Sequence, residues 1–111
     1  MSAPRDDSVY IGHILDSIDQ IESYLEGVGE DQFMTTAMLQ DAVIRQIQII
    51  GEAANRLSAE FRARSSSIPW PDIVGMRNKL VHDYMGVDLA AVWDTATVDL
   101  VQLREQLRKL D

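Results

Sequence analysis

The chain has 111 residues, the length of one ordinary domain, and 46% of them are hydrophobic, which excludes the composition of a disordered segment. Its formal net charge of −8 opposes non-specific binding of long nucleic-acid duplexes, and the absence of cysteine excludes a disulfide framework and a thiolate metal site. We therefore expect one domain over residues 1–111.

The first residues, MSAPRDDS, lack the basic and then apolar pattern of a signal sequence. No apolar run approaches the length of about 18 residues that is typical of a membrane-spanning helix. We expect a cytoplasmic protein that does not enter a membrane.

The first predicted helix has the polar residues Asp6, Asp7 and Ser8 at its start, and these suit a helix N-terminus. Apolar residues then recur at steps of three or four up to Val28, and Gly27 lies where the helix should end.

The second predicted helix begins between residues 31 and 36 and continues to about Ala63. Its apolar spacing again indicates one buried face. The apolar positions are Met34, Met38, Ala42, Ile44, Ile47, Ile50, Ala54, Leu57 and Phe61.

The stretch SSSIPWP interrupts this pattern, and Pro71 suits the first turn of a third helix that ends at His82 or Tyr84, with Gly86 beyond it. Asp88 can cap a fourth helix. Together these elements predict an all-α protein, an antiparallel bundle of four to five helices. The apolar line of the fourth helix is Leu89, Val92, Trp93, Ala96, Leu100, Leu103, Leu107 and Leu110.

The third helix carries the stretch RNKLVHDY, residues 77–84, which is too polar for a helix that only builds a core. At about 100° per residue, Arg77 shares a face with Tyr84, and Asn78 shares another with His82. These side chains cover a broad arc, so we expect them to line a cleft against another helix or a second copy of the chain.

Charge is distributed unevenly around this stretch. Residues 61–82 have a net charge of +3, whereas residues 1–60 have −8 and residues 83–111 have −3. A local anion site on an acidic protein is therefore possible.

Arginine binds phosphate oxygens, and histidine transfers protons near neutral pH. Arg77 and His82 together suit cleavage of RNA by its own 2′-hydroxyl, without a metal or a cofactor. Spacing alone leaves simpler roles open: His82 as a capping or core residue and Tyr84 as a packing contact. His13, the other histidine, is interpreted as structural, and no helical metal-ligand spacing is present.

The second helix carries a polar line of five residues. In one interpretation it forms two ion pairs, Asp41–Arg45 and Glu52–Arg56, on a solvated face. In the other, part of the line, with Glu52 first and Arg45 second as candidates, lines the cleft. The fifth member of the line is Gln48.

The segments DAVIRQIQIIGEAANRLSAEF and IPWPDIVGMRNKLVHDYMGVDLAAVWDT resemble the HepT-like proteins of the HEPN superfamily. The resemblance extends over about residues 8–107. An Arg-x-x-x-x-His motif alone is loose, but the Asn after the Arg, the Tyr two after the His, and the upstream IGEA and PW make it specific.

The resemblance implies a HEPN-type helical bundle that forms a homodimer and acts as a metal-independent endoribonuclease. It implies the toxin of a toxin–antitoxin pair, whose antitoxin is an MntA-like nucleotidyltransferase that transfers AMP to a tyrosine. On this chain Arg77 and His82 become the catalytic pair, Asn78 supports them, and Tyr84 becomes the adenylylation site. The alternative is a non-catalytic, nucleotide-binding subunit of a nucleotidyltransferase complex, which the net charge of −8 favours.

Overall fold

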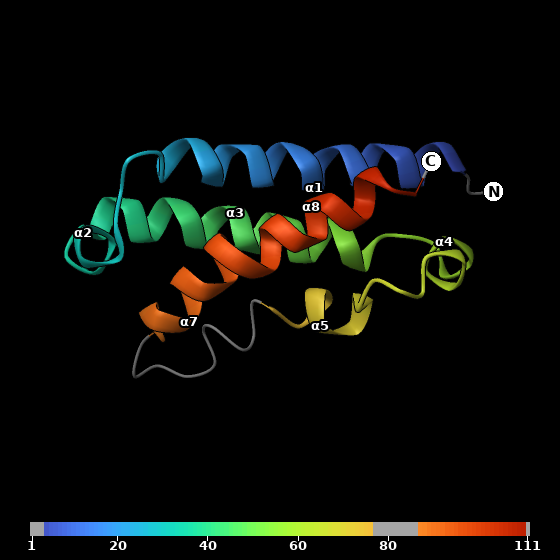
Figure 1. Ribbon diagram of the computed structural model, residues 1–111. Coiled ribbons are helices and arrows are strands. Elements are labelled where there is room, and N and C mark those ends of the chain that lie inside the picture. Colours follow the sequence, from blue (N-terminus) through green and yellow to red (C-terminus); the bar gives the residue numbers. More distant parts are fainter. Residues whose placement is uncertain (1–3, 77–86, 111) are drawn as a thin grey trace.

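The computed structural model describes residues 4–76 and 87–110, and within these ranges the chain is helical with no strand, which confirms the predicted all-α class (Figure 1). None of the helices in these ranges has the length and apolar character needed to cross a bilayer. The elements are α1 Pro4–Tyr24, α2 Glu30–Met34, α3 Ala37–Asn55, α4 Ala59–Arg64, α5 Trp70–Val74, α7 Leu89–Asp94, the π-helix η1 Thr95–Asp99 and α8 Leu100–Arg108.

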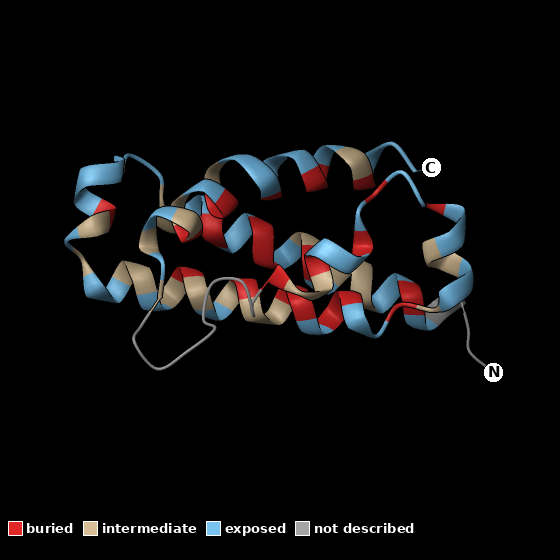
Figure 2. Cartoon of the chain, turned by 90° about the horizontal axis from the view of Figure 1, so that it is seen from below, coloured by how far each residue is buried: buried red, intermediate tan, exposed pale blue. Residues whose placement is uncertain are grey.

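The longest helices, α1 and α3, lie side by side and run in opposite directions (Figure 1). The continuous path α7–η1–α8 crosses this pair obliquely, and its C-terminal end returns to the end of the bundle where α1 begins. Buried residues follow the facing sides of these helices, and exposed residues follow the outer sides (Figure 2). The core is thus the space between the antiparallel pair and the third helical path.

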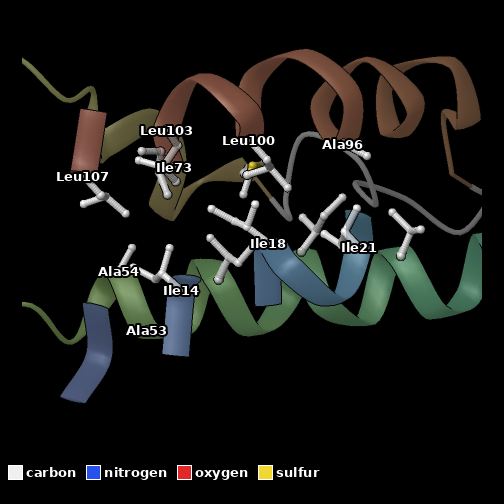
Figure 3. Close-up of a cluster of buried hydrophobic side chains, with 14 of the residues drawn as sticks. Ile14, Ile18, Ile21, Ala53, Ala54, Ile73, Ala96, Leu100, Leu103 and Leu107 are labelled. Carbon is white, nitrogen blue, oxygen red and sulfur yellow. The ribbon is translucent and has the colours of Figure 1, made fainter. Parts of the chain in front are cut away.

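The side chains of α1 that enter this core are Ile14, Ile18 and Ile21, each at most 2% exposed. Their spacing of four and then three residues places them on one face of the helix. Figure 3 shows them facing Ala96, Leu100, Leu103 and Leu107 of the third path, with Ala53 and Ala54 of α3 alongside. Burial of each isoleucine contributes about 1.5–3 kcal/mol relative to exposure.

The predicted second helix, from residues 31–36 to Ala63, is wrong in its extent. The structure divides this segment into α2, α3 and α4. The predicted core position Met38 is 83% exposed, whereas Phe33, which was not predicted to be buried, is fully enclosed and packs on Trp93 with 5.4 Å between ring centroids. The apolar positions between Ile47 and Leu57 are mostly confirmed, since Ile47, Ile50, Ala54 and Leu57 are all buried.

Contacts distant in sequence explain why the helix stops at Asn55. Asp7 of α1 accepts hydrogen bonds from the backbone N–H and the hydroxyl of Ser58, both at 2.7 Å. The Ser58 oxygen in turn accepts from the N–H of Phe61 and caps α4. Arg62 donates hydrogen bonds to the carbonyl oxygens of Ala54 and Asn55 at 2.9 Å. These carbonyls at the C-terminal end of α3 thus find a side-chain donor in place of a helical one.

The predicted fourth helix is confirmed in its cap and in most of its buried positions. The Asp88 carboxylate accepts a hydrogen bond from the N–H of Ala91, and the buried residues include Val92, Leu100 and Leu107. Leu110, at the end of the predicted apolar line, is instead 39% exposed. The helix also contains a π-helical turn, in which the N–H of Leu100 donates to the carbonyl of Thr95.

One arginine joins α8 to α1. Arg104 donates two hydrogen bonds to the Glu22 carboxylate, at 2.7 and 2.8 Å, and a third to Asp19 at 3.0 Å. The bidentate bond to Arg104 holds the pKa of Glu22 below its usual value. Because the Arg104 side chain is nearly buried while the carboxylates are exposed, the ion pairs close the surface above the core.

The Glu22 pair predicts a specific pH dependence of stability. A carboxylate whose pKa is lowered by folding contributes stability above its unfolded pKa of about 4.3, and the contribution is lost as the pH falls through the folded pKa. We expect Glu22→Gln to lower the melting temperature at pH 7 by about 2–6 °C. The difference from wild type should shrink as the pH falls below about 4 in thermal melts followed by circular dichroism.

Asp16→Asn is the matched control, because Asp16 is exposed on the same helix and has no ion-pair partner among residues 4–76 and 87–110. A Glu22→Gln effect that did not shrink as the pH was lowered, or one that Asp16→Asn reproduced, would contradict the role of the pair.

Candidate functional site

The short helix α5 leads directly into the predicted motif, and a buried tryptophan anchors its start. Trp70 is 1% exposed, and its indole N–H donates to the Ser65 hydroxyl oxygen at 2.9 Å. The same hydroxyl donates to the carbonyl of Phe61 at 2.7 Å, and the Phe61 and Trp70 rings lie 6.0 Å apart. Pro71 occupies the first turn as predicted, but the predicted third helix is wrong in its extent, because α5 ends at Val74 with Gly75 as its C-cap. These two consecutive hydrogen bonds of Ser65, enclosed by apolar side chains, thus fix the orientation of α5.

The other end of α5 rests on the middle of α3. A Cβ atom at Gly51 would lie 3.5 Å from the carbonyl oxygen of Val74 and 3.7 Å from that of Ile73. These are ordinary contact distances, so an alanine would just fit and any larger side chain would push α5 away. The glycine of the upstream IGEA therefore marks the close approach of two helix backbones.

The motif residues Arg77, Asn78, His82 and Tyr84 lie outside the residues that the structure describes. The last described residue before them is Met76, which is 7% exposed and belongs to the core. Arg77 is thus bonded to a residue whose position is set by packing.

The polar line on α3 lies mostly in solvent. Asp41, Arg45, Glu52 and Arg56 are exposed, and Gln48 is half-buried. Within the described part of the chain, neither Asp41–Arg45 nor Glu52–Arg56 forms an ion pair, so that detail of the solvated-face interpretation is wrong. Glu52 directly follows Gly51, which places it next to the contact with α5.

Two basic residues of the positive segment 61–82 lie among the described residues. Arg62 binds the carbonyls at the end of α3, and Arg64 lies over the Phe61 ring at 5.4 Å. Both belong to α4, at the end of the bundle near the chain termini (Figure 1). Arg62 and Arg64, two of the four basic residues of segment 61–82, therefore make local contacts within the bundle.

A groove of about 520 Å³ lies between α5 and the path α7–η1–α8. Its floor is apolar and includes Ile73, Met76, Leu100 and Leu103, which belong to the core. None of its lining residues among those described is basic. We call it the acidic groove, because four aspartates line it: Asp72, Asp88, Asp94 and Asp99.

Sequence reasoning did not identify this groove. Asp94 and Asp99 are five residues apart, which in an α-helix places them about 140° apart. The π-helical turn closes a hydrogen bond over five residues instead, which brings these positions toward the same side. No pattern in the sequence predicts a π turn, so only the structure places both carboxylates on the groove.

Comparison with known proteins gives a family. Residues 14–110 match the model of the family described as ribonuclease HepT-like. A Methanocaldococcus jannaschii protein named as a gamma-glutamylcyclotransferase and candidate RNase is 44% identical over 106 residues, which are 96% of this chain but only 48% of that protein. The chain thus spans about half the length of this relative.

Two other relatives are covered almost fully. A candidate RNase of Caldanaerobacter subterraneus subsp. tengcongensis is 34% identical over 99% of this chain and 96% of its own length. A "probable ribonuclease HepT" of Thermococcus cleftensis is 35% identical over 91% of this chain and 92% of its own length. No solved structure matches the chain significantly.

The Trp70 anchor can be tested through its hydroxyl partner. Ser65→Ala leaves the buried indole N–H without its acceptor, so we expect a loss of about 1–3 kcal/mol in the free energy of unfolding. Urea denaturation followed by tryptophan fluorescence measures it. Ser66→Ala, at the exposed neighbouring residue, should change the free energy by less than about 0.5 kcal/mol. Equal effects of the two variants would contradict the anchoring role.

Proposed function

Because the chain belongs to the ribonuclease HepT-like family, we propose that it is an RNA endonuclease and the toxin of a toxin–antitoxin pair, with residues 1–111 forming one domain. The observation that carries this proposal is the family match over residues 14–110, which includes every residue of the predicted motif. The names of the two relatives that are covered almost fully, a candidate RNase and a "probable ribonuclease HepT", support the same activity.

We assign the chemistry to Arg77 and His82. His82 removes the proton from the 2′-hydroxyl of the substrate, the oxygen attacks the neighbouring phosphorus, and the bond to the 5′ oxygen breaks. Arg77 stabilises the negative charge on the phosphoryl oxygens. A protonated His82 of a second copy donates its own proton to the leaving 5′ oxygen, while the first His82 keeps the proton that it removed; this step requires a homodimer and no metal. Asn78 supports Arg77 and His82 by holding these side chains or the phosphate in place.

The geometry of the described residues supports a fixed active site. Rigid positioning of reacting groups is a large part of enzymatic rate enhancement. Here the chain enters the motif through the buried residues Trp70, Ile73 and Met76 and against the backbone of Gly51. Glu52 and Arg45 are exposed on the same helix as Gly51 and are proposed to line the cleft.

We further propose that an MntA-like nucleotidyltransferase neutralises the toxin by transferring AMP to Tyr84. The tyrosine oxygen attacks the α-phosphorus of ATP, and pyrophosphate leaves. Tyr84 lies seven residues, or about two helical turns, after Arg77. The added phosphate can pair with Arg77 and occupy the position that an RNA phosphate requires.

A second candidate function is a non-catalytic, nucleotide-binding subunit of a nucleotidyltransferase complex. The net charge of −8 favours it, because phosphate backbones attract basic surfaces. Growth distinguishes the two functions: only a toxin arrests growth when expressed alone, and His82→Ala relieves the arrest.

Cleavage itself depends on His82. A general acid–base group contributes about 10²–10⁴ in rate, so we expect His82→Ala to lower the cleavage rate of a fluorescent single-stranded RNA by at least about 10². EDTA should leave the wild-type rate unchanged.

His13→Ala is the matched control, because His13 is exposed on α1 and contacts Tyr10 edge to face with 6.0 Å between ring centroids. It should cleave as wild type does. Loss of activity in EDTA, or full activity of His82→Ala, would refute the mechanism.

Adenylylation is read from intact mass. After incubation with the nucleotidyltransferase and ATP, the chain should gain one or more AMP masses, and its RNA cleavage should stop. Tyr84→Phe should keep its mass and continue to cleave, whereas Tyr10→Phe and Tyr24→Phe should be modified as wild type is. If the Tyr84→Phe variant still gains AMP, the modified residue is not Tyr84 and this proposal is wrong.

A further inference from the structure

We propose that the contact between Gly51 of α3 and the last turn of α5 positions the proposed active site, so that the size of the side chain at residue 51 sets the rate of RNA cleavage. Gly51 is buried, and it acts as a positioning residue through Arg77 without touching the substrate. This inference rests on the proposed function, because it takes Arg77 as a group that must be placed for cleavage.

The contact lies at the end of α5 from which the chain enters the motif. The atoms nearest to a Cβ at Gly51 are the carbonyl oxygens of Val74 and Ile73, at 3.5 and 3.7 Å. Val74 is the last residue of α5 and precedes Arg77 by three residues. The Trp70 anchor holds the opposite end of the helix, seven residues before Arg77. The Gly51 contact therefore acts on the last turn of α5, whereas the tryptophan acts on the first.

Both partners in this contact are backbone atoms, which cannot yield as the end of a flexible side chain can. A single added Cβ is accommodated, because 3.5 Å is an ordinary contact distance. The γ carbons of a valine extend about 1.5 Å beyond Cβ and reach into the space of the two carbonyl oxygens. The last turn of α5 must then move away from α3.

The core can absorb such a movement while the fold persists. Met76 is the core residue bonded to Arg77, and an unbranched methionine side chain adapts to irregular gaps. Its side chain can therefore repack while the backbone of α5 shifts. Reacting groups tolerate much less, since a misplacement of about 1 Å can lower a rate by about 10². Cleavage is thus more sensitive than stability to the size of residue 51.

The test compares Gly51→Ala, Gly51→Val and the control Ala53→Val by the kcat and KM for cleavage of a single-stranded RNA. Ala53 is 4% exposed and lies about 200° around α3 from Gly51. The control valine thus crowds the core on the opposite side of the same helix. Thermal melts give the Tm of each variant, and all rates are measured at a temperature at which every variant is folded.

We expect Gly51→Ala to keep kcat within about twofold and to raise Tm by about 2–6 °C, because alanine favours a helix over glycine. Gly51→Val should lower kcat at least about tenfold through the displaced Arg77. Its KM should stay within about threefold, because phosphate contacts along the strand dominate RNA affinity. Ala53→Val should lower Tm and leave kcat within about twofold.

Two results overturn the proposal. One is a wild-type kcat in Gly51→Val. The other is an equal loss of kcat in Ala53→Val, because cleavage would then follow stability. If Gly51→Val does not fold, Gly51→Ser takes its place with an expected loss of kcat of at least about threefold, and a wild-type kcat in that variant overturns the proposal as well.

The backbone amide signals of residues 77–84 separate this inference from the proposed function. In two-dimensional proton–nitrogen NMR spectra, Gly51→Val should shift these signals and Ala53→Val should leave them in place. A wild-type chain that does not cleave RNA refutes the ribonuclease, while the same pattern of shifts still supports the Gly51 contact as what positions the motif. A chain that cleaves RNA, but whose kcat and amide signals do not change in Gly51→Val, keeps the ribonuclease and overturns the positioning contact.

Discussion

The indole of Trp70 lies where the helical pair α1–α3 is joined to the segment that carries the motif. Its ring is enclosed beside Phe61, its N–H is satisfied by Ser65, and the helix that it begins is pressed against Gly51. If this anchor were displaced, Ile73 and Met76 would leave the core together. The position at which the chain enters the proposed active site therefore depends on the buried hydrogen bonds of Ser65 and on Gly51, whose lack of a side chain lets α5 approach α3.

The negative charge of the protein is not a uniform obstacle to RNA. The outer face of α3 presents two acids and two bases, Asp41, Arg45, Glu52 and Arg56, and so has no net charge. The acidic groove carries four aspartates and, among its described lining residues, no base. On the proposed function, RNA approaches over this face of α3, where no net negative charge repels it.

Prediction from sequence succeeded where a helix is amphipathic over many turns and failed where a helix is interrupted. The apolar spacing of α1, the cap at Asp88 and the buried positions Leu100 and Leu107 follow from local periodicity. The break after Asn55 does not, because Asp7, 51 residues away from Ser58, stabilises the N-terminus of α4. Helix propensity is a weak signal that such a contact readily overrides.

The sequence by itself determined the all-α class, the helical faces of the core and the polar motif that led to a family. These depend on residue spacing along one helix, which local geometry sets. Only the tertiary structure decided that α5 meets α3 at Gly51, that Arg104 binds Glu22, and that a π turn brings Asp94 and Asp99 onto one groove. Each of these depends on the approach of separate helices or on a shift of helical phase, and neither leaves a periodic signal in the chain.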